Sequence, residues 1–392
     1  MLVASAGAVD AGVRVGMRRG GVATIAPGAV MLDRDLEKEA RALDAIAIAM
    51  LQFTPEVAFT ADFSVLLDVG ASLRLFGGPL ALCRRVSDVV RRLGFTGRIG
   101  AAPTAEGSWL LAHAALGRHR PHRRCMKMST LAWRLDLLPC SLVSSAAPFM
   151  TWFDGIGAVT LGDLRKLPRT GLLRRTSKQL LYSLDRAYGE VEEMQRWIAI
   201  PARFAAYIET FDRIEQAEAL MHGATTLILQ LTGWLAARQL AVITFQLLME
   251  HERGRAAVPP TSLEITLAEP AWKEPHLLSL LKERLAKTEL TAPVIGLRLE
   301  VVQLEAMQPP TDQLFPEPGC SPAYFTRLLE LLSARLGPEN VLAPVGSPDH
   351  QPELCNSWGP ATTKMKSAPE EDIVLDRPCF VLPNPIQLLM RD

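Results

Sequence analysis

The sequence lacks the features that mark a zinc protein, a secreted protein or a membrane protein. Its six cysteines are scattered without a C-x-x-C pair, and with seven dispersed histidines they give no zinc-site spacing. Every apolar run is broken by charge or glycine well short of the ~20 residues that cross a bilayer. The apolar start also has no basic region typical of a signal peptide. We therefore expect reduced cysteines, no metal or other cofactor, and a cytoplasmic protein.

Net charge is absent too. The 392 residues include 42 Lys and Arg and 42 Asp and Glu, so no global field attracts the chain to nucleic acid. Any contact with nucleic acid must therefore come from local clusters of basic residues. A composition of 48% hydrophobic and 21% charged residues is that of an ordinary globular protein. The length allows about two to four domains, each with its own core.

Helical and strand-like patterns alternate over the first third of the chain. Apolar residues recur at helical spacing after Asp33, which is the expected N-cap of the first long helix. Leu80 is expected on the buried side of the next helix. The elements predicted here are helices at 36–53, 78–93 and 105–116 and strands at 57–59, 64–69 and 97–101.

The later part of the chain is first helical and then mixed. Residues 130–195 show mainly helical patterns, and 200–305 alternate between strand and helix. Residues 308–319 are rich in proline and indicate a linker, followed by a helix at 322–337. The strands expected in the mixed region are 243–250 and 293–307, with an amphipathic helix at 275–288 between them. Over the first third of the chain, strands and helices that alternate with short turns predict an α/β arrangement in which helices cover a sheet.

Three segments carry a resemblance to a known family. ASAGAVDAGVRVGM (4–17), LLDVGASLRLFGGP (66–79) and IGAAPTAEGSWLLAHA (99–114) occur in order along the chain. They resemble the fingers segment, a palm strand, and the last palm strand and helix of Y-family DNA polymerases, the UmuC-domain family. The middle segment is most similar to the ImuB-type branch. Residues 155–190 and RPCFVLPNPIQLLMR (377–391) also resemble that branch, so the resemblance extends over nearly the whole chain.

The resemblance implies how the chain is divided. It implies an α+β multidomain fold with a Y-family polymerase-like palm and fingers, a helical thumb with a helix-hairpin-helix, and an α/β little finger. The expected ranges are fingers and partial palm at 1–118, thumb at 119–195, little finger at 196–307, linker and helix at 308–342, and C-terminal tail at 343–392.

The resemblance also shows what a polymerase would need. Nucleotidyl transfer uses two divalent ions, and Mg²⁺ requires carboxylate ligands, which this family supplies from one early Asp and an adjacent Asp-Glu pair. Counting back from Leu67 and Asp68, the Asp-Glu positions hold Phe63 and Ser64. The strand with the early Asp would precede Met1, so we expect it to be missing. We therefore predict no catalytic residue, no metal site and no nucleotidyltransferase activity.

The positions aligned with the family's triphosphate contacts also lack the residues that a polymerase needs. The family's triphosphate-binding Tyr and Arg fall on Ala6 and Val9, and its palm lysine falls on Ala114. Asp62 and Asp68 would project from one face of a strand and could enter the site only after a register slip. We instead expect Asp62 to end a turn and Asp68 to be structural.

The segment 155–190 carries the expected DNA contact. Its Gly-Ile-Gly turn resembles a helix-hairpin-helix, whose backbone N–H groups meet a DNA phosphate. Basic residues cluster after it, with only Asp154 and Asp163 as nearby acids, and such a cluster binds DNA without sequence preference. The alternative is a solvated helical hairpin that only packs on the palm. The candidate DNA-binding residues are Gly155, Gly157, Arg165, Lys166, Arg169, Arg174, Arg175 and Lys178.

Two further segments invite a binding interpretation. Thr311-Asp312-Gln313-Leu314-Phe315 is similar to the clamp-binding pentapeptide of the family, in which a Leu-Phe pair enters an apolar pocket; a chance exposed Leu-Phe is the alternative. A second basic cluster is more simply a surface loop than a phosphate contact. Its arginines are Arg118, Arg120, Arg123 and Arg124.

The resemblance implies a non-catalytic accessory protein of DNA-damage tolerance. It would bridge primer-template DNA, the sliding clamp, an error-prone DnaE-type polymerase and a RecA-like ImuA-type partner, with no membrane association. Two alternatives stay open at this point. One is an active Y-family DNA polymerase, which Phe63 and Ser64 oppose; the other is a degenerate, truncated gene product.

Overall fold

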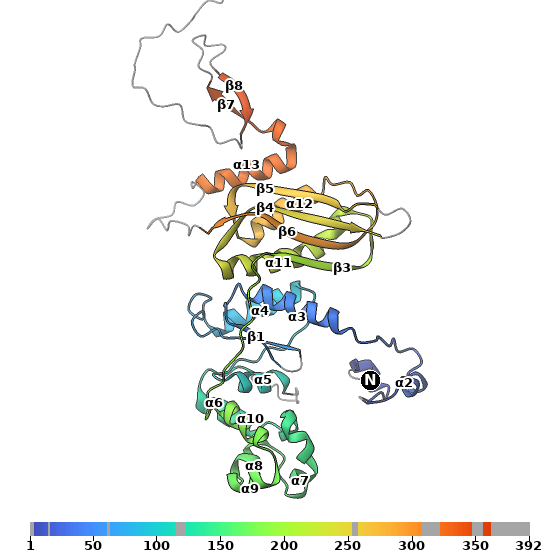
Figure 1. Ribbon diagram of the computed structural model, residues 1–392, viewed down its shortest axis with the longest axis vertical. Helices are drawn as coiled ribbons and strands as arrows, with labels where there is room; N and C mark the ends of the chain where they lie inside the picture. Colours follow the sequence, from blue (N-terminus) through green and yellow to red (C-terminus); the bar gives the residue numbers. More distant parts are fainter. Residues whose placement is uncertain are drawn as a thin grey trace, which may run out of the picture. The chain divides into compact units, whose positions relative to one another are not determined.

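The computed structural model in Figure 1 divides into two compact units, residues 1–44 and residues 45–392. The second unit contains helices and sheets in separate groups, so the expected α+β fold class is confirmed. Among the residues that the structure describes, no helix is both long and apolar enough to cross a membrane. The described residues are 4–14, 16–60, 63–114, 123–252, 258–307, 322–346 and 356–361.

The first unit holds two short helices and the start of a third. These are α1 (Ala6–Asp10), α2 (Arg19–Ile25) and the beginning of α3 (Leu36–Met50). The N-cap of α3 is Asp35, whose Oδ1 accepts hydrogen bonds from the N–H groups of Glu37 and Lys38 at 3.1 and 3.0 Å. The prediction of Asp33 as this cap was wrong, because Asp33 lies farther from the helix and pairs with Arg19 at 3.2 Å.

The second unit begins with a hairpin and a helix. Strands β1 (Val57–Thr60) and β2 (Ser64–Leu67) pair antiparallel, with Thr60 opposite Ser64 and Val57 opposite Leu67. Helix α4 (Pro79–Arg92) starts with proline, which supplies a helical φ and needs no N–H partner at this position. Its Leu82 and Val89 join Phe53, Val57 and Leu93 in one core cluster.

Two details of this region differ from the prediction. Leu80 is 57% exposed, because the buried stripe of α4 runs through Leu82 and Val89 on its other side. The strand expected at 97–101 is not formed; only Ala101 makes an isolated bridge, to Arg124. Gly100 lies so close to the following helix that a Cβ there would be 2.1 Å from the carbonyl oxygen of Ser108, and this packing replaces strand pairing.

Residues 105–114 and 123–188 form a group of helices around one apolar core, as the helical pattern predicted. Buried leucines from five of the helices, among them Leu131, Leu161 and Leu180, fill this core together with Phe153. The helices are α5 (Ala105–His113), α6 (Met128–Asp136), α7 (Met150–Gly155), α8 (Leu161–Lys166), α9 (Arg169–Arg175) and α10 (Lys178–Tyr188).

Residues 205–252 and 258–306 contain an antiparallel sheet with strand order β3-β6-β4-β5. Helices α11 and α12 pack on the sheet and on each other (Figure 1), where Trp234, Phe245, Leu277 and Leu297 are fully buried. The strands expected at 243–250 and 293–307 and the helix at 275–288 are confirmed. The elements are β3 (Ala205–Ile214), α11 (Met221–Arg238), β4 (Leu240–His251), β5 (Thr261–Ala271), α12 (Glu274–Leu285) and β6 (Val294–Ala306).

Helix α13 (Pro322–Leu336) confirms the helix expected after the proline-rich segment, and it docks on α12 and β5. Its Glu330 is buried and accepts from the backbone N–H of Ala268 and lies 2.9 Å from Nε2 of His276. A hairpin of β7 (Leu342–Gly346) and β8 (Asn356–Pro360) follows, which the sequence did not predict.

Close backbone contacts tie the sheet region to the β1–β2 region. A Cβ at Gly233 of α11 would lie 2.1 Å from the carbonyl oxygen of Ile48 in α3, so any larger residue would force α3 and α11 apart. Arg92 of α4 pairs with Glu274 of α12. Leu229 of α11 joins the core cluster of α3, β1 and α4.

Candidate nucleic-acid interface and polymerase-like positions

Phe63 and Ser64 lie at the turn that joins β1 to β2. Ser64 is the first residue of β2 and pairs with Thr60, whose hydroxyl donates to the Ser64 carbonyl at 3.3 Å. Phe63 has a left-handed backbone with φ of 55° and a side chain that is 58% exposed. A phenyl ring and a hydroxyl at this turn offer no carboxylate to a divalent ion.

The Asp68 carboxylate cannot replace the Asp-Glu pair that is missing at positions 63 and 64. It follows the last residue of β2, so it lies about 13 Å from Ser64 along the strand at the usual rise per residue. Its Oδ1 accepts the N–H of Gly70 at 3.0 Å, which makes it a turn residue. The hairpin register is regular from Val57 to Thr60, and Asp62 lies outside the described residues.

The positions aligned with triphosphate contacts carry no cation. Val9 is an exposed apolar residue of α1, a helix that begins at Ala6. Ala114 is buried at the end of α5. Within the part of the chain that the structure describes, no three His, Cys, Asp or Glu side chains gather in a way that could hold a metal ion.

The Gly-Ile-Gly segment forms the expected tight turn between α7 and α8. Gly155 ends α7, and Gly157 has φ of 72°, a conformation that glycine adopts without strain. The turn closes on itself, because the N–H of Gly157 donates to Asp154 at 3.1 Å and the N–H of Ala158 donates to Phe153 at 2.9 Å. These two amides are therefore used inside the protein.

The start of α8 is capped by its own carboxylate. Thr160 and Asp163 form a capping box, and Oδ2 of Asp163 accepts the N–H groups of Val159 and Thr160 at 3.3 and 3.1 Å. Hydrogen bonds from the Thr160 side chain and backbone, with smaller contributions, lower the pKa of Asp163. A phosphate at this turn would have to displace Asp163, because these backbone N–H groups already donate to its carboxylate.

Helix α8 is fixed to its neighbours through Asp136, at the end of α6. A Cβ at Gly162 would lie 2.8 Å from the Asp136 carbonyl oxygen, and the Tyr188 hydroxyl donates to Oδ1 of Asp136 at 2.7 Å. The guanidinium of Arg165 lies 4.5 Å from the centre of the Tyr188 ring and 3.8 Å from the Asp136 carboxylate. Burial and this carboxylate raise the pKa of Tyr188 well above its usual range.

Three of the six candidate basic side chains are paired with acids. Besides Arg165, Lys166 lies 3.5 Å from Asp163, and Arg169 pairs with Asp185 and, at 3.4 Å, with Glu190. The expectation that only Asp154 and Asp163 lie near was wrong, because folding brings Asp136, Asp185 and Glu190 to these side chains.

The other three candidate basic side chains are exposed, and none of them has a carboxylate within 4.0 Å among the described residues. They are Arg174 and Arg175 in the last turn of α9 and Lys178 in the first turn of α10. Arg175 also lies 5.9 Å from the ring centre of Trp152. We call Arg174, Arg175 and Lys178 the basic patch.

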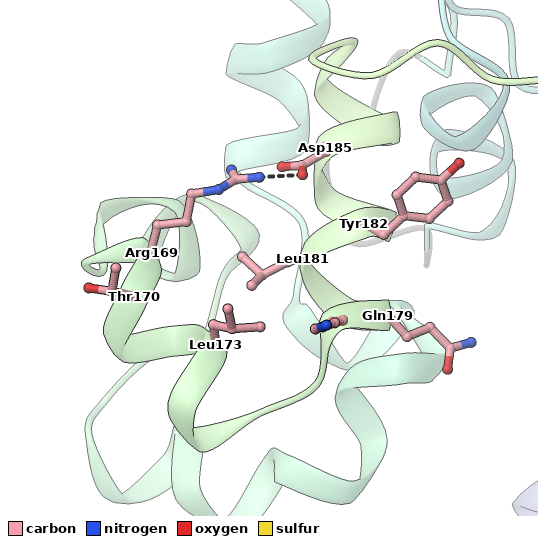
Figure 2. A pocket seen from close by; sticks show the side chains of 8 residues that line it. Arg169, Thr170, Leu173, Gln179, Leu181, Tyr182 and Asp185 are labelled. Atoms are coloured by element: carbon pink, nitrogen blue, oxygen red, sulfur yellow. Dashed lines mark hydrogen bonds and ion pairs between the residues drawn. The ribbon is translucent and has the colours of Figure 1, made fainter.

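An open groove runs between α9 and α10 beside the basic patch. Figure 2 shows Leu173 of α9 and Leu181 of α10 close together in it, with the pair of Arg169 and Asp185 at one end. Sequence reasoning missed this groove, since its two walls are adjacent only after α9 and α10 pack. Its lining residues are Arg169, Thr170, Leu173, Lys178, Gln179, Leu181, Tyr182 and Asp185.

The remaining candidate segments are only partly described. Arg123 and Arg124 lie beside the bridge to Ala101, whereas Arg118 and Arg120 fall outside the described residues. The pentapeptide from Thr311 to Phe315 also lies outside them.

The capping box gives a testable pH dependence. A lowered pKa means that the Asp163 carboxylate stabilises the folded state above its unfolded pKa of about 3.9, and that this contribution is lost as the pH falls through the folded pKa. We expect Asp163→Asn to lower the urea midpoint of the protein at pH 7, with a smaller deficit in acid, measured by circular dichroism. Asp154→Asn, at the C-terminal end of α7, is the control and leaves the midpoint unchanged. Equal midpoints for Asp163→Asn and the unchanged chain at pH 7 would contradict the cap.

Comparison with known sequences gives two matches. Residues 1–113 match the impB/mucB/samB family. Protein ImuB of Caulobacter vibrioides, in two strains, is 22% identical over 298 residues. This match covers 76% of the chain and 62% of ImuB, so the chain spans less than two thirds of that relative's length.

Solved structures with a similar arrangement include a Dbh ternary complex and DinB from Sulfolobus solfataricus. The first has a TM-score of 0.42 at 14% identity and covers 76% of this chain and 88% of that one. The second has a TM-score of 0.41 at 14% identity and covers 75% and 85%. The resemblance that the sequence motifs indicated is confirmed by the sequence matches: residues 1–113 match the impB/mucB/samB family, and 298 residues of the chain are similar to Protein ImuB.

Proposed function

We propose that this chain is a non-catalytic accessory protein of error-prone translesion synthesis that binds primer-template DNA. The observation that carries the proposal is the β1–β2 turn, where Phe63 and Ser64 stand at the positions aligned with the family's Asp-Glu pair. Without these carboxylates, two divalent ions would lack ligands for activating a primer hydroxyl and neutralising a triphosphate. The match of residues 1–113 to the family supports placing this turn in the palm.

DNA binding in this proposal rests on side chains more than on backbone amides. The basic patch of Arg174, Arg175 and Lys178 has no carboxylate partner among the described residues, while Arg165, Lys166 and Arg169 hold carboxylates. Gly155 and Gly157 shape the turn beside them. Phosphate contacts of this kind give affinity without sequence preference and make it depend on salt.

The proposed partners are those that the resemblance to ImuB-type proteins implies. We propose that Thr311, Asp312, Gln313, Leu314 and Phe315 bind the sliding clamp through the Leu-Phe pair. An error-prone DnaE-type polymerase would supply the chemistry that this chain lacks. A RecA-like ImuA-type protein completes the proposed assembly.

Salt dependence tests the DNA-binding part. We expect the double change Arg174→Gln and Lys178→Gln to weaken binding of a fluorescent primer-template and to reduce the slope of log K against log salt by about 2, roughly one for each phosphate that is no longer neutralised. Lys166→Gln is the matched control, because Lys166 is exposed but paired with Asp163, and it should change the slope less. Anisotropy titrations at several KCl concentrations measure this slope for the unchanged chain, the double variant and Lys166→Gln. An unchanged slope for the double variant rules out the basic patch as the contact.

Clamp binding has its own test. We expect the sliding clamp to retain the full chain in a pull-down and to release it after Leu314→Ala and Phe315→Ala together, since these side chains would fill the apolar pocket. Leu342→Ala with Trp358→Ala is the matched control, because it removes two exposed apolar side chains elsewhere. Equal retention of all forms removes the clamp from the proposal.

A further inference from the structure

The groove between α9 and α10 has an apolar floor and a polar rim. Leu181 is buried and Leu173 is 41% exposed, so the floor presents aliphatic surface to solvent. Gln179 and Thr170 line the groove with groups that can donate and accept hydrogen bonds. Such a surface suits a flat, partly apolar group that carries hydrogen-bonding edges.

Tyr182 of α10 also lines this groove, and Figure 2 shows its ring projecting from α10 on the side away from Leu173 and α9. Its side chain is 49% exposed, and the guanidinium of Arg186 lies 5.6 Å from the ring centre. Arg186 is itself held by Glu106 at 3.2 Å and by Glu193 at 3.4 Å. The ring is therefore supported by an anchored cation while part of its surface stays open to solvent.

The charge around the groove favours a polyanion. Of the five basic side chains over residues 169–188, Arg169 and Arg186 pair with carboxylates, whereas Arg174, Arg175 and Lys178 have none within 4.0 Å among the described residues. Asp185 lies in the groove wall but is engaged by Arg169, so it presents no free negative charge. Lys178 lines the groove, and Arg174 and Arg175 lie in the last turn of α9.

We propose that this groove binds single-stranded nucleic acid, with an unpaired base stacked on Tyr182 and the adjacent phosphates on Lys178 and Arg174. The proposal rests on the DNA-binding function proposed above and names the nucleic-acid form that this part of the site takes. Aromatic side chains beside basic ones bind single strands because every base has a face to stack. A duplex hides those faces within its own stack and offers the groove only phosphates and base edges. An apolar peptide would fill the floor but would gain nothing from the excess of basic side chains.

The test compares single-stranded and duplex DNA on the full chain. We expect Tyr182→Leu, which keeps an apolar side chain but removes the ring, to weaken binding of a fluorescent oligothymidylate by about fivefold or more. Its affinity for a blunt duplex should stay within about twofold, because phosphate contacts are unchanged. Tyr182→Phe keeps the ring and should bind the single strand as the unchanged chain does. Trp133→Leu is the matched control, since Trp133 is an exposed aromatic of α6 outside the groove.

Each outcome separates this proposal from the one on which it rests. Weaker single-strand binding in Tyr182→Leu alone, with duplex affinity kept, supports the stacking groove. Equal single-strand affinity in Tyr182→Leu and Trp133→Leu overturns it. Binding of the duplex without the single strand overturns the groove and leaves the DNA-binding function standing, whereas binding of neither overturns both. Equal urea midpoints for the Tyr182 and Trp133 variants show that the comparison is between folded proteins.

Discussion

The Asp136 carboxylate and backbone join three helices of the helical group. Its Oδ1 accepts the Tyr188 hydroxyl of α10 at 2.7 Å, its carboxylate lies 3.8 Å from Arg165 of α8, and its carbonyl oxygen leaves room only for glycine at position 162. A partly buried charge of this kind is stabilised by its partners and becomes costly when they are removed. The relative placement of α8 and α10 therefore depends on this residue, and α9 is held to α10 by the pair of Arg169 and Asp185.

This arrangement determines which groups are available for the proposed DNA contact. The turn between α7 and α8 uses its amides internally, because Asp154, Phe153 and Asp163 accept them. Arginines that pair with carboxylates hold the helices together, and the basic side chains without such partners among the described residues gather where α9 ends and α10 begins. The proposed DNA interface is thus shifted from the glycine turn toward the basic patch and the groove beside it.

Local patterns in the sequence predicted most of the elements but not their contacts. The helices at 78–93 and 275–288 follow from apolar spacing, and the β1–β2 hairpin follows from two short apolar runs around a turn. The strand expected at 97–101 failed because Gly100 packs on α5, a contact that no local pattern encodes. The candidate basic residues could be named from the sequence, but their division into paired and free could not. That division depends on Asp136 and Asp185, which approach Arg165 and Arg169 only in the folded chain.

The central claim is that a polymerase-related scaffold here binds DNA without performing nucleotidyl transfer. The most direct measurement is a primer-extension assay with the purified chain, all four deoxynucleoside triphosphates and Mg²⁺ or Mn²⁺, run on primer-template that gel shift shows to be bound. The account predicts bound DNA and no extended primer with either metal. Metal-dependent extension that Asp68→Ala abolishes would contradict it, because a carboxylate that caps a turn after β2 would then be serving as a metal ligand.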